Sequence, residues 1–220
     1  MAGMTEHNSV QQPLVDELVR LGWSYSPGKS LDRQLEQVFI ESEVVDALVR
    51  LNPDVAEVPA RASEVVKQLR NLTFQVDDEG LVETNRDAMS WLRGLQTHKF
   101  VGADAFRPVR LIDFEDPANN RLVVADEVSF GSPGNKARFD IVLFVNGLPL
   151  AVMELKSASD ENVDITDGYN QLQTYKHQIG SLFYYNELLV VSDGPNARIG
   201  SLTANQEWFK VWRTIDGEGD

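Results

Sequence analysis

Three ionisable residues stand at the ends of two apolar runs in the second half of the sequence. Asp140 precedes the run 141–145, and Glu154 and Lys156 follow the run 150–153. Charged groups beside buried strands are unfavourable unless they pair with one another or bind a metal. Side chains alternate along a strand, so Glu154 and Lys156 share one face. A carboxylate and an amine therefore meet at one place, with a second carboxylate within reach.

This set of groups fits metal-assisted hydrolysis. Two carboxylates and a nearby backbone carbonyl, which we assign to Leu155, form the oxygen ligand set that Mg²⁺ prefers. Lys156 could orient or deprotonate an attacking water, or stabilise negative charge on a phosphate, and the sequence leaves both roles open. A Glu-x-Lys triplet also occurs by chance, so a salt bridge at a strand end is the competing interpretation. The buried runs and the hairpin between them favour the metal site.

The turn at Asn146-Gly147 decides whether Asp140 can join Glu154. A two-residue loop would set Asp140 opposite Met153, on the wrong face of the sheet. A three-residue loop of residues 145–147, with a bulge at Gly147, would set Asp140 opposite Val152 and diagonal to Glu154 on the same face. We predict the bulged loop.

The spacing of apolar residues predicts helices first and strands later. Helical spacing covers residues 10–21, 31–51, 60–72 and 84–95, while the acidic cluster 77–80 is typical of a turn. Strand patterns cover 109–114, 121–130, 137–145, 148–156 and 188–192, with a helix at 166–179. The predicted fold class is α/β, a mixed sheet flanked by helices with an N-terminal helical portion.

Composition sets limits on the cellular context and on the partners. The chain has 220 residues, no cysteine, 42% hydrophobic residues and a formal net charge of −14. Without cysteine there is no disulfide or thiolate metal site, and without a signal sequence or long apolar run we expect a soluble cytoplasmic protein. The acidic charge argues against autonomous DNA binding. His7, His98 and His177 lack zinc-ligand spacing.

Several segments of the sequence resemble a known family. The acid, acid-x-lysine pattern resembles PD-(D/E)xK nucleases, and NGLPLAVMELKSAS is similar to the restriction subunits of type I restriction-modification enzymes. TEHNSVQQPLVDELVRLGWSY and FEDPANNRLVV carry the same resemblance, which therefore spans most of the chain.

The resemblance implies roles for particular residues. Asp140 and Glu154 would be metal ligands and Lys156 the catalytic lysine. Gln171 and Tyr175 would form the Q-x-x-x-Y motif, which braces the site or contacts DNA, because residues four apart share a helix face. Taken without the resemblance, the helix pattern favours Tyr175 in an apolar stripe with Leu172 and Ile179, and Gln171 in solvent. Position 139 is Phe where many members have proline, which is no ligand.

The resemblance also implies an assembly. The domain would cut double-stranded DNA with Mg²⁺ in a complex with specificity and methylation subunits, while a separate motor region uses ATP. This sequence has no Gly-x-x-x-x-Gly-Lys-Ser/Thr loop for ATP. We expect a helical portion at 1–100, an endonuclease core at 101–214 and a linker at 215–220 leading to a motor region.

Two alternatives stay open: a stand-alone repair or recombination nuclease, and a docking module that kept the fold without catalysis. Metal binding that depends on Asp140 or Glu154 would separate the docking module from the nucleases. Position 11 is Gln where other nucleases carry a glutamate, so a second metal there is in doubt.

Overall fold

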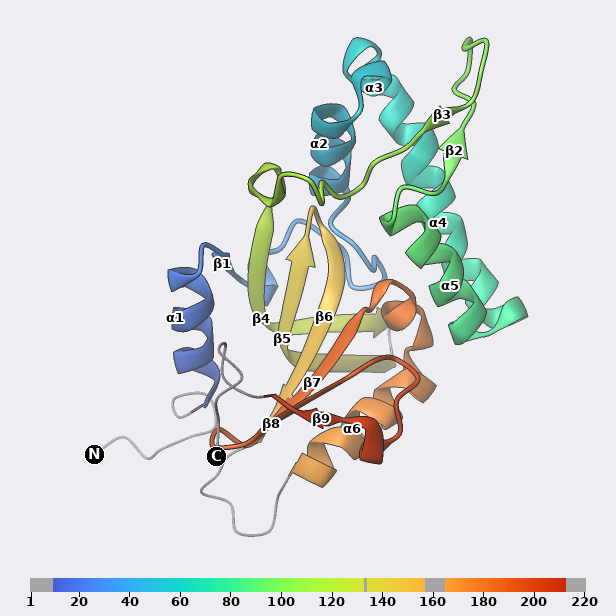
Figure 1. Cartoon of the computed structure of the whole chain (residues 1–220). Helices are drawn as coiled ribbons and strands as arrows, with labels where there is room; N and C mark the ends of the chain where they lie inside the picture. The colour runs from blue at the N-terminus through green and yellow to red at the C-terminus, as the bar shows by residue number, and fades with distance from the viewer. Residues whose placement is uncertain (1–9, 133, 157–164, 213–220) are drawn as a thin grey trace.

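The computed structural model describes residues 10–132, 134–156 and 165–212, which build one mixed seven-stranded sheet flanked by helices (Figure 1). The strand order is β1-β4-β5-β6-β7-β8-β9, with β1–β4 and β6–β7 parallel and the other pairs antiparallel. The elements in chain order are α1 (Gln12–Arg20), β1 (Ser24–Pro27), α2 (Glu41–Leu51), α3 (Pro53–Glu57), α4 (Ala62–Glu79), α5 (Leu81–Leu92), β2 (Thr97–His98), β3 (Arg107–Pro108), β4 (Leu122–Ser132), β5 (Asn135–Val145), β6 (Leu148–Leu155), α6 (Ile165–Gln178), β7 (Leu188–Ser192), β8 (Ala197–Gly200) and β9 (Lys210–Val211).

The sheet separates two apolar cores. Helix α1 covers one face, where Val15 packs with Ile141 and Met153 of the central strands. The larger core on the other face joins the sheet to α2, α4, α5 and α6. The apolar runs of β5 and β6 are buried, as expected for strands covered on both faces. No helix within the described part of the chain is long and apolar enough to cross a membrane.

The β4–β5 ribbon bends where Glu127 faces Asp140. The register runs from Asp126 opposite Ile141 to Val128 opposite Phe139, and Glu127 between them has a φ of +48°. Beyond this point the ribbon crosses the rest of the sheet (Figure 1). A positive φ is unfavourable for glutamate, and such irregularities re-aim side chains in a sheet. The bend therefore places Asp140 where the two directions of the ribbon meet.

The turn between β5 and β6 differs from the predicted one. Val145 pairs with Leu148, so the loop has two residues, and Asn146 and Gly147 both have positive φ, as a type I′ turn requires. The three-residue loop with a bulge at Gly147 was wrong. The bulge lies instead at Leu150 of β6, because Phe144 pairs with Pro149 and Leu143 with Ala151.

Proline and one carbonyl group account for the position of this bulge. Pro149 has no backbone N–H for the ladder, and in central strands proline is confined to irregular positions. The Leu150 carbonyl, displaced from the regular pattern, accepts a hydrogen bond from the Glu187 backbone N–H at 2.8 Å. Because of the extra residue, each β6 residue after Leu150 pairs with a β5 residue one position away from the partner that a regular ladder would give it.

The first hundred residues are less helical than predicted. The segment 24–27 forms β1, an edge strand parallel to β4, and α2 begins at Glu41 rather than at residue 31. Residues 31–40 pack along the β4–β5 ribbon: the Gly131 N–H donates to the Leu35 carbonyl, and Arg33 donates to the Ser129 carbonyl. Contacts with the ribbon replace the helical bonds that the spacing suggested.

Two further expectations were wrong. Residues 109–114 form no strand, since their backbone bonds go elsewhere: Arg110 exchanges two bonds with the Asn52 side chain. The acidic cluster at 77–79 belongs to α4, and only Gly80, at a φ of +85°, breaks the helix. The remaining predicted strands and the helix at 166–179 are confirmed within a few residues, while 215–220 lie outside the described residues.

The type I′ turn gives a test of the hairpin. Gly147 has a φ of +81°, and a Cβ there would lie 2.5 Å from the Ile40 carbonyl oxygen. Gly22 has a φ of +99° with no atom within 4 Å of such a Cβ. Both alanine variants should lose about 1–2 kcal/mol to backbone strain, and Gly147→Ala about 1–3 kcal/mol more through overlap. Denaturant unfolding measures the difference, and equal losses in the two variants would contradict the tight packing of the turn.

Candidate active site

The bend of β5 and the end of β6 bring the two predicted carboxylates together. Ile141 pairs with Met153, and the same register continued by one residue sets Asp140 opposite Glu154. We had expected Asp140 to lie opposite Val152. The Asp140 Oδ2 atom accepts a hydrogen bond of 2.8 Å from the Leu155 backbone N–H. The bulge in β6 therefore places Asp140 and Glu154 on the same face of the sheet, which we had expected the loop to do.

Lys156 lies between the carboxylates and helix α6. Its Nζ atom donates to Glu154 Oε1 at 2.8 Å and to Gln171 Oε1 at 2.6 Å. Gln171 Nε2 in turn donates to the Tyr175 hydroxyl oxygen at 2.6 Å, and that hydroxyl donates to the Arg138 carbonyl at 3.3 Å. This chain of bonds joins β6, α6 and β5, and it includes Lys156, Glu154, Gln171 and Tyr175, four of the five predicted side chains.

Tyr175 has both of the roles that the sequence left open. Its ring packs edge-to-face against Phe139, with centroids 4.7 Å apart, and belongs to the border of the larger core. Burial raises the pKa of its hydroxyl, so the group stays protonated and able to donate. The apolar ring anchors the helix, and the polar end continues the bond chain from Lys156.

Burial makes the negative charges of the site unfavourable. Burial raises the pKa of the Asp140 carboxyl, and the Leu155 N–H together with the Lys156 and Arg138 charges only partly opposes that shift. Glu154 is 1% exposed, and the Lys156 ammonium contacts it directly. The Asp140 carboxyl also lies within hydrogen-bonding reach of the Glu154 side chain. A bound cation would stabilise two acids held this closely, of which Glu154 is buried and Asp140 half-buried.

Two acidic residues on β4, next to the bend, were not among the residues predicted from the sequence. Asp126 is 8% exposed; its Oδ2 accepts from the Tyr25 hydroxyl at 3.0 Å and, at the 3.5 Å limit, from Gln11 Nε2. Glu127 follows it at the bend. Two consecutive acids that interrupt an apolar strand could have drawn attention, by the same argument that selected Glu154. Gln11, at the position flagged for a missing glutamate, is buried against Asp126.

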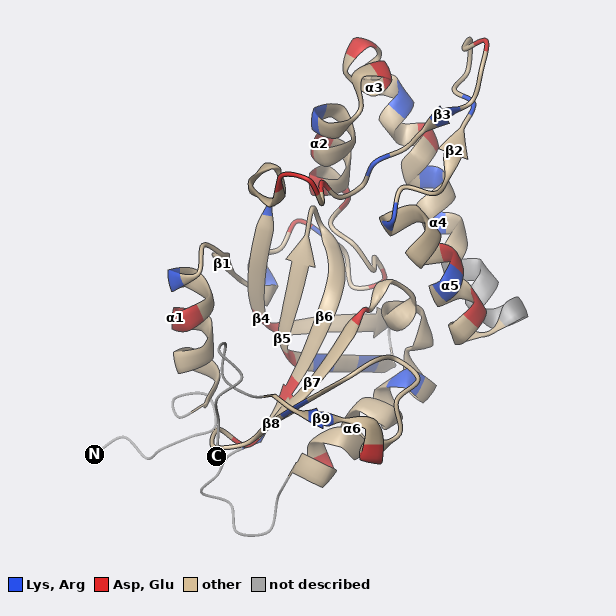
Figure 2. Ribbon diagram, in the orientation of Figure 1, with Lys and Arg blue, Asp and Glu red and all other residues tan. Residues whose placement is uncertain are grey.

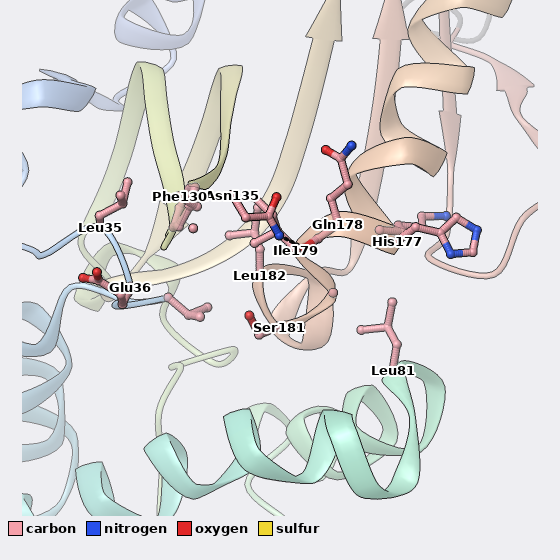
Figure 3. A pocket seen from close by; sticks show the side chains of 14 residues that line it. Leu35, Glu36, Leu81, Phe130, Asn135, His177, Gln178, Ile179, Ser181 and Leu182 are labelled. Carbon is pink, nitrogen blue, oxygen red and sulfur yellow. Dashed lines mark hydrogen bonds between the residues drawn. The ribbon is translucent and has the colours of Figure 1, made fainter. Parts of the chain in front are cut away.

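A cleft of about 450 Å³ lies near the site but is separate from it (Figure 3). Its lining includes Phe130 and Asn135 of the β4–β5 ribbon and Ile179 and Leu182 beyond α6. None of the five predicted site residues lines it. The candidate site residues thus lie on the adjacent strands β5 and β6 and on one face of α6 rather than in this cleft.

Fold and site together define a class of protein. An α/β domain with a mixed sheet flanked by helices, and with two acids and a lysine on two adjacent strands, is consistent with a PD-(D/E)xK-like nuclease domain. Residues 3–208 match the family model described as "Type I restriction enzyme R protein N terminus". The chain belongs to this family.

Curated relatives carry matching names. The chain is 35% identical to the type I restriction enzyme HindI endonuclease subunit of Haemophilus influenzae, over 97% of this chain and 21% of that protein. It is 29% identical to the type I restriction enzyme EcoprrI endonuclease subunit of Escherichia coli, over 84% of this chain and 61% of that protein. The chain therefore spans about a fifth of the length of the HindI subunit.

The raised pKa of Asp140 leads to a stability prediction. A carboxyl whose pKa is higher in the folded state destabilises that state once pH rises above this pKa. Asp140→Asn keeps an acceptor for the Leu155 N–H and removes the charge. We expect this variant to have a higher melting temperature than the unaltered protein at pH 7–8 in EDTA, with the gain fading below about pH 4, where aspartate is protonated in both states.

Thermal unfolding across pH measures this effect. The exposed Asp104→Asn is the matched control, in which the same chemical change away from the site should leave the melting temperature nearly unaltered. A lower melting temperature for Asp140→Asn at pH 7–8 would contradict the account of buried charge.

Proposed function

We propose that this chain is the Mg²⁺-dependent endonuclease domain of a type I restriction enzyme, which hydrolyses phosphodiester bonds of double-stranded DNA. The observation that carries the proposal is the meeting of Asp140, at the bend of β5, with Glu154 and Lys156 at the end of the neighbouring strand β6. Membership in the R protein N-terminal family and relatives named as endonuclease subunits support it. The activity would belong to a complex with specificity and methylation subunits in the cytoplasm.

The residues present fit a hard divalent cation. In the part of the chain that the structure describes, no group of three or more His, Cys, Asp or Glu side chains could hold a metal together. Mg²⁺ does not need one, because it usually takes one or two carboxylates and keeps several waters. Asp140 and Glu154 would supply the carboxylates. Since N–H and C=O of one strand residue point to the same neighbour, the Leu155 carbonyl is expected on the side of Asp140.

Each residue then has a defined task. When bound, Mg²⁺ would help generate a nucleophilic water and offset charge on the phosphate. Asp140 and Glu154 would hold the ion, and the Leu155 N–H orients Asp140. Lys156, kept in place by Gln171, would position the attacking water or stabilise charge on the phosphate oxygens. Tyr175 would brace Gln171 and the strand that carries Asp140.

The alternatives are less well supported. A stand-alone repair or recombination nuclease would share the site, but the named relatives are subunits of restriction enzymes. A docking module without catalysis would have no need of an acid pair, a lysine and a bracing glutamine in hydrogen-bonding contact. We retain the division into residues 1–100 and a core at 101–214, although β1 of the first portion belongs to the sheet of the core. ATP would be used by a motor region outside this sequence.

The test is DNA cleavage in Mg²⁺ by the complete complex carrying Lys156→Ala. Loss of a group that positions a water or stabilises transition-state charge should slow cutting by about 10²–10⁴-fold. ATP-driven translocation, measured in the same samples, should be retained because the motor lies elsewhere. The exposed Lys67→Ala is the control for loss of one lysine. Unimpaired cutting by Lys156→Ala would show that Lys156 is only a strand-end salt bridge.

A further inference from the structure

The part of the β4–β5 ribbon beyond the bend carries basic side chains next to the candidate site. We call residues 128–132 and 135–139 the arm. On β5, Lys136 and Arg138 are exposed and alternate with buried Ala137 and Phe139. Figure 2 shows basic residues on this crossing part of the ribbon. In a chain with a net charge of −14, the arm carries two exposed cations on the strand that leads to Asp140.

Arg138 is the closer of the two to the site. It precedes Asp140 by two residues on one strand, a separation of about 7 Å between the backbones. Arg138 is therefore a close neighbour of a proposed metal ligand along the same strand.

The backbone of Arg138 is fixed relative to the catalytic groups. Its carbonyl accepts from the Tyr175 hydroxyl at the end of the bond chain that starts at Lys156. The next residue, Phe139, is fully buried against the same tyrosine ring. A guanidinium group that starts from a fixed backbone position can bind a neighbouring group in a reproducible geometry.

The side chain of Arg138, in contrast, is available. Its Nη1 atom lies 3.2 Å from Glu127 Oε1, and the two side chains are 62% and 53% exposed. Exposed ion pairs of this kind contribute at most about 1 kcal/mol, so a stronger ligand can displace the glutamate. Arginine binds phosphate through two parallel hydrogen bonds, which makes a phosphate such a ligand.

We propose that Arg138 binds a DNA backbone phosphate next to the one that is cut, and that Glu127 occupies the guanidinium until DNA replaces it. This inference rests on the proposed nuclease function. Glu127 stands opposite Asp140 at the bend, in a backbone conformation that glutamate rarely adopts. The bend thus brings the competing carboxylate, the arginine and the metal ligand to one place.

The test compares the two partners of the ion pair in the complete complex. Cutting is measured over a range of KCl concentrations, with translocation as the internal reference. Arg138→Ala should slow cutting by about 10–100-fold. It should also reduce the slope of log cutting rate against log KCl concentration by about one. Arg138→Lys keeps the positive charge but cannot form two parallel hydrogen bonds to a phosphate. It should therefore cut DNA more slowly than the unaltered complex, with an unchanged salt dependence. Glu127→Gln removes the competitor and should speed cutting by about two- to fivefold.

Arg86→Ala is the matched control, because Arg86 and Glu83 form an exposed pair on α5 with similar exposures of 70% and 51%. Equal losses in Arg138→Ala and Glu127→Gln would mean that the pair is only structural, which overturns the proposal. Normal cutting and salt dependence in Arg138→Ala, with Lys156→Ala inactive, would overturn it while the nuclease function stands. Normal cutting by Lys156→Ala would instead reject the nuclease function itself.

Discussion

The candidate site depends on one extra residue in strand β6. The type I′ turn at Asn146-Gly147, continued in a regular ladder, would set Asp140 opposite Met153 and on the far face from Glu154. The bulge at Leu150 shifts the strand by one residue, and the two carboxylates then face each other. Pro149 and the bond from the Glu187 N–H to the Leu150 carbonyl fix the position of that bulge.

Charge balance governs the rest of the site. Asp140 and Glu154 are held away from water, where ionised carboxylates are unfavourable, and three kinds of group oppose that cost: a backbone N–H, the Lys156 ammonium and the more distant Arg138. Gln171 and Tyr175 hold the lysine in place from α6. Without a cation, the two carboxylates lower the stability of the folded state, and the same arrangement suits the binding of a cation. Functional sites commonly reduce stability in this way.

The sequence predicted the sheet centre and the candidate residues, because both depend on local signals. The apolar runs of β5 and β6 had to be buried, and charged residues at their ends needed partners. The register was predicted wrongly because Asn146-Gly147 permits two loop types. Pro149, whose presence in a central strand indicates a bulge, was not taken into account.

Tertiary contacts explain the other differences. Residues 109–114 include several apolar side chains, yet side chains such as Asn52 and Asn146 satisfy their backbone groups instead of a neighbouring strand. Strand β1 is short, polar and ends in Pro27, so its pairing with β4 leaves no apolar pattern to read. The bend at Glu127 is equally invisible, since nothing about glutamate predicts a positive φ.

The most direct test of the account is the affinity of the proposed site for a divalent cation. Mn²⁺ takes the same oxygen ligands as Mg²⁺, and calorimetric titration can compare the unaltered protein with Asp140→Asn and with Asp104→Asn as control. The account predicts that the unaltered protein and the control bind Mn²⁺ alike, and that Asp140→Asn binds at least about tenfold more weakly. No binding by the unaltered protein, or equal affinity in all three, would contradict a metal site formed by Asp140 and Glu154.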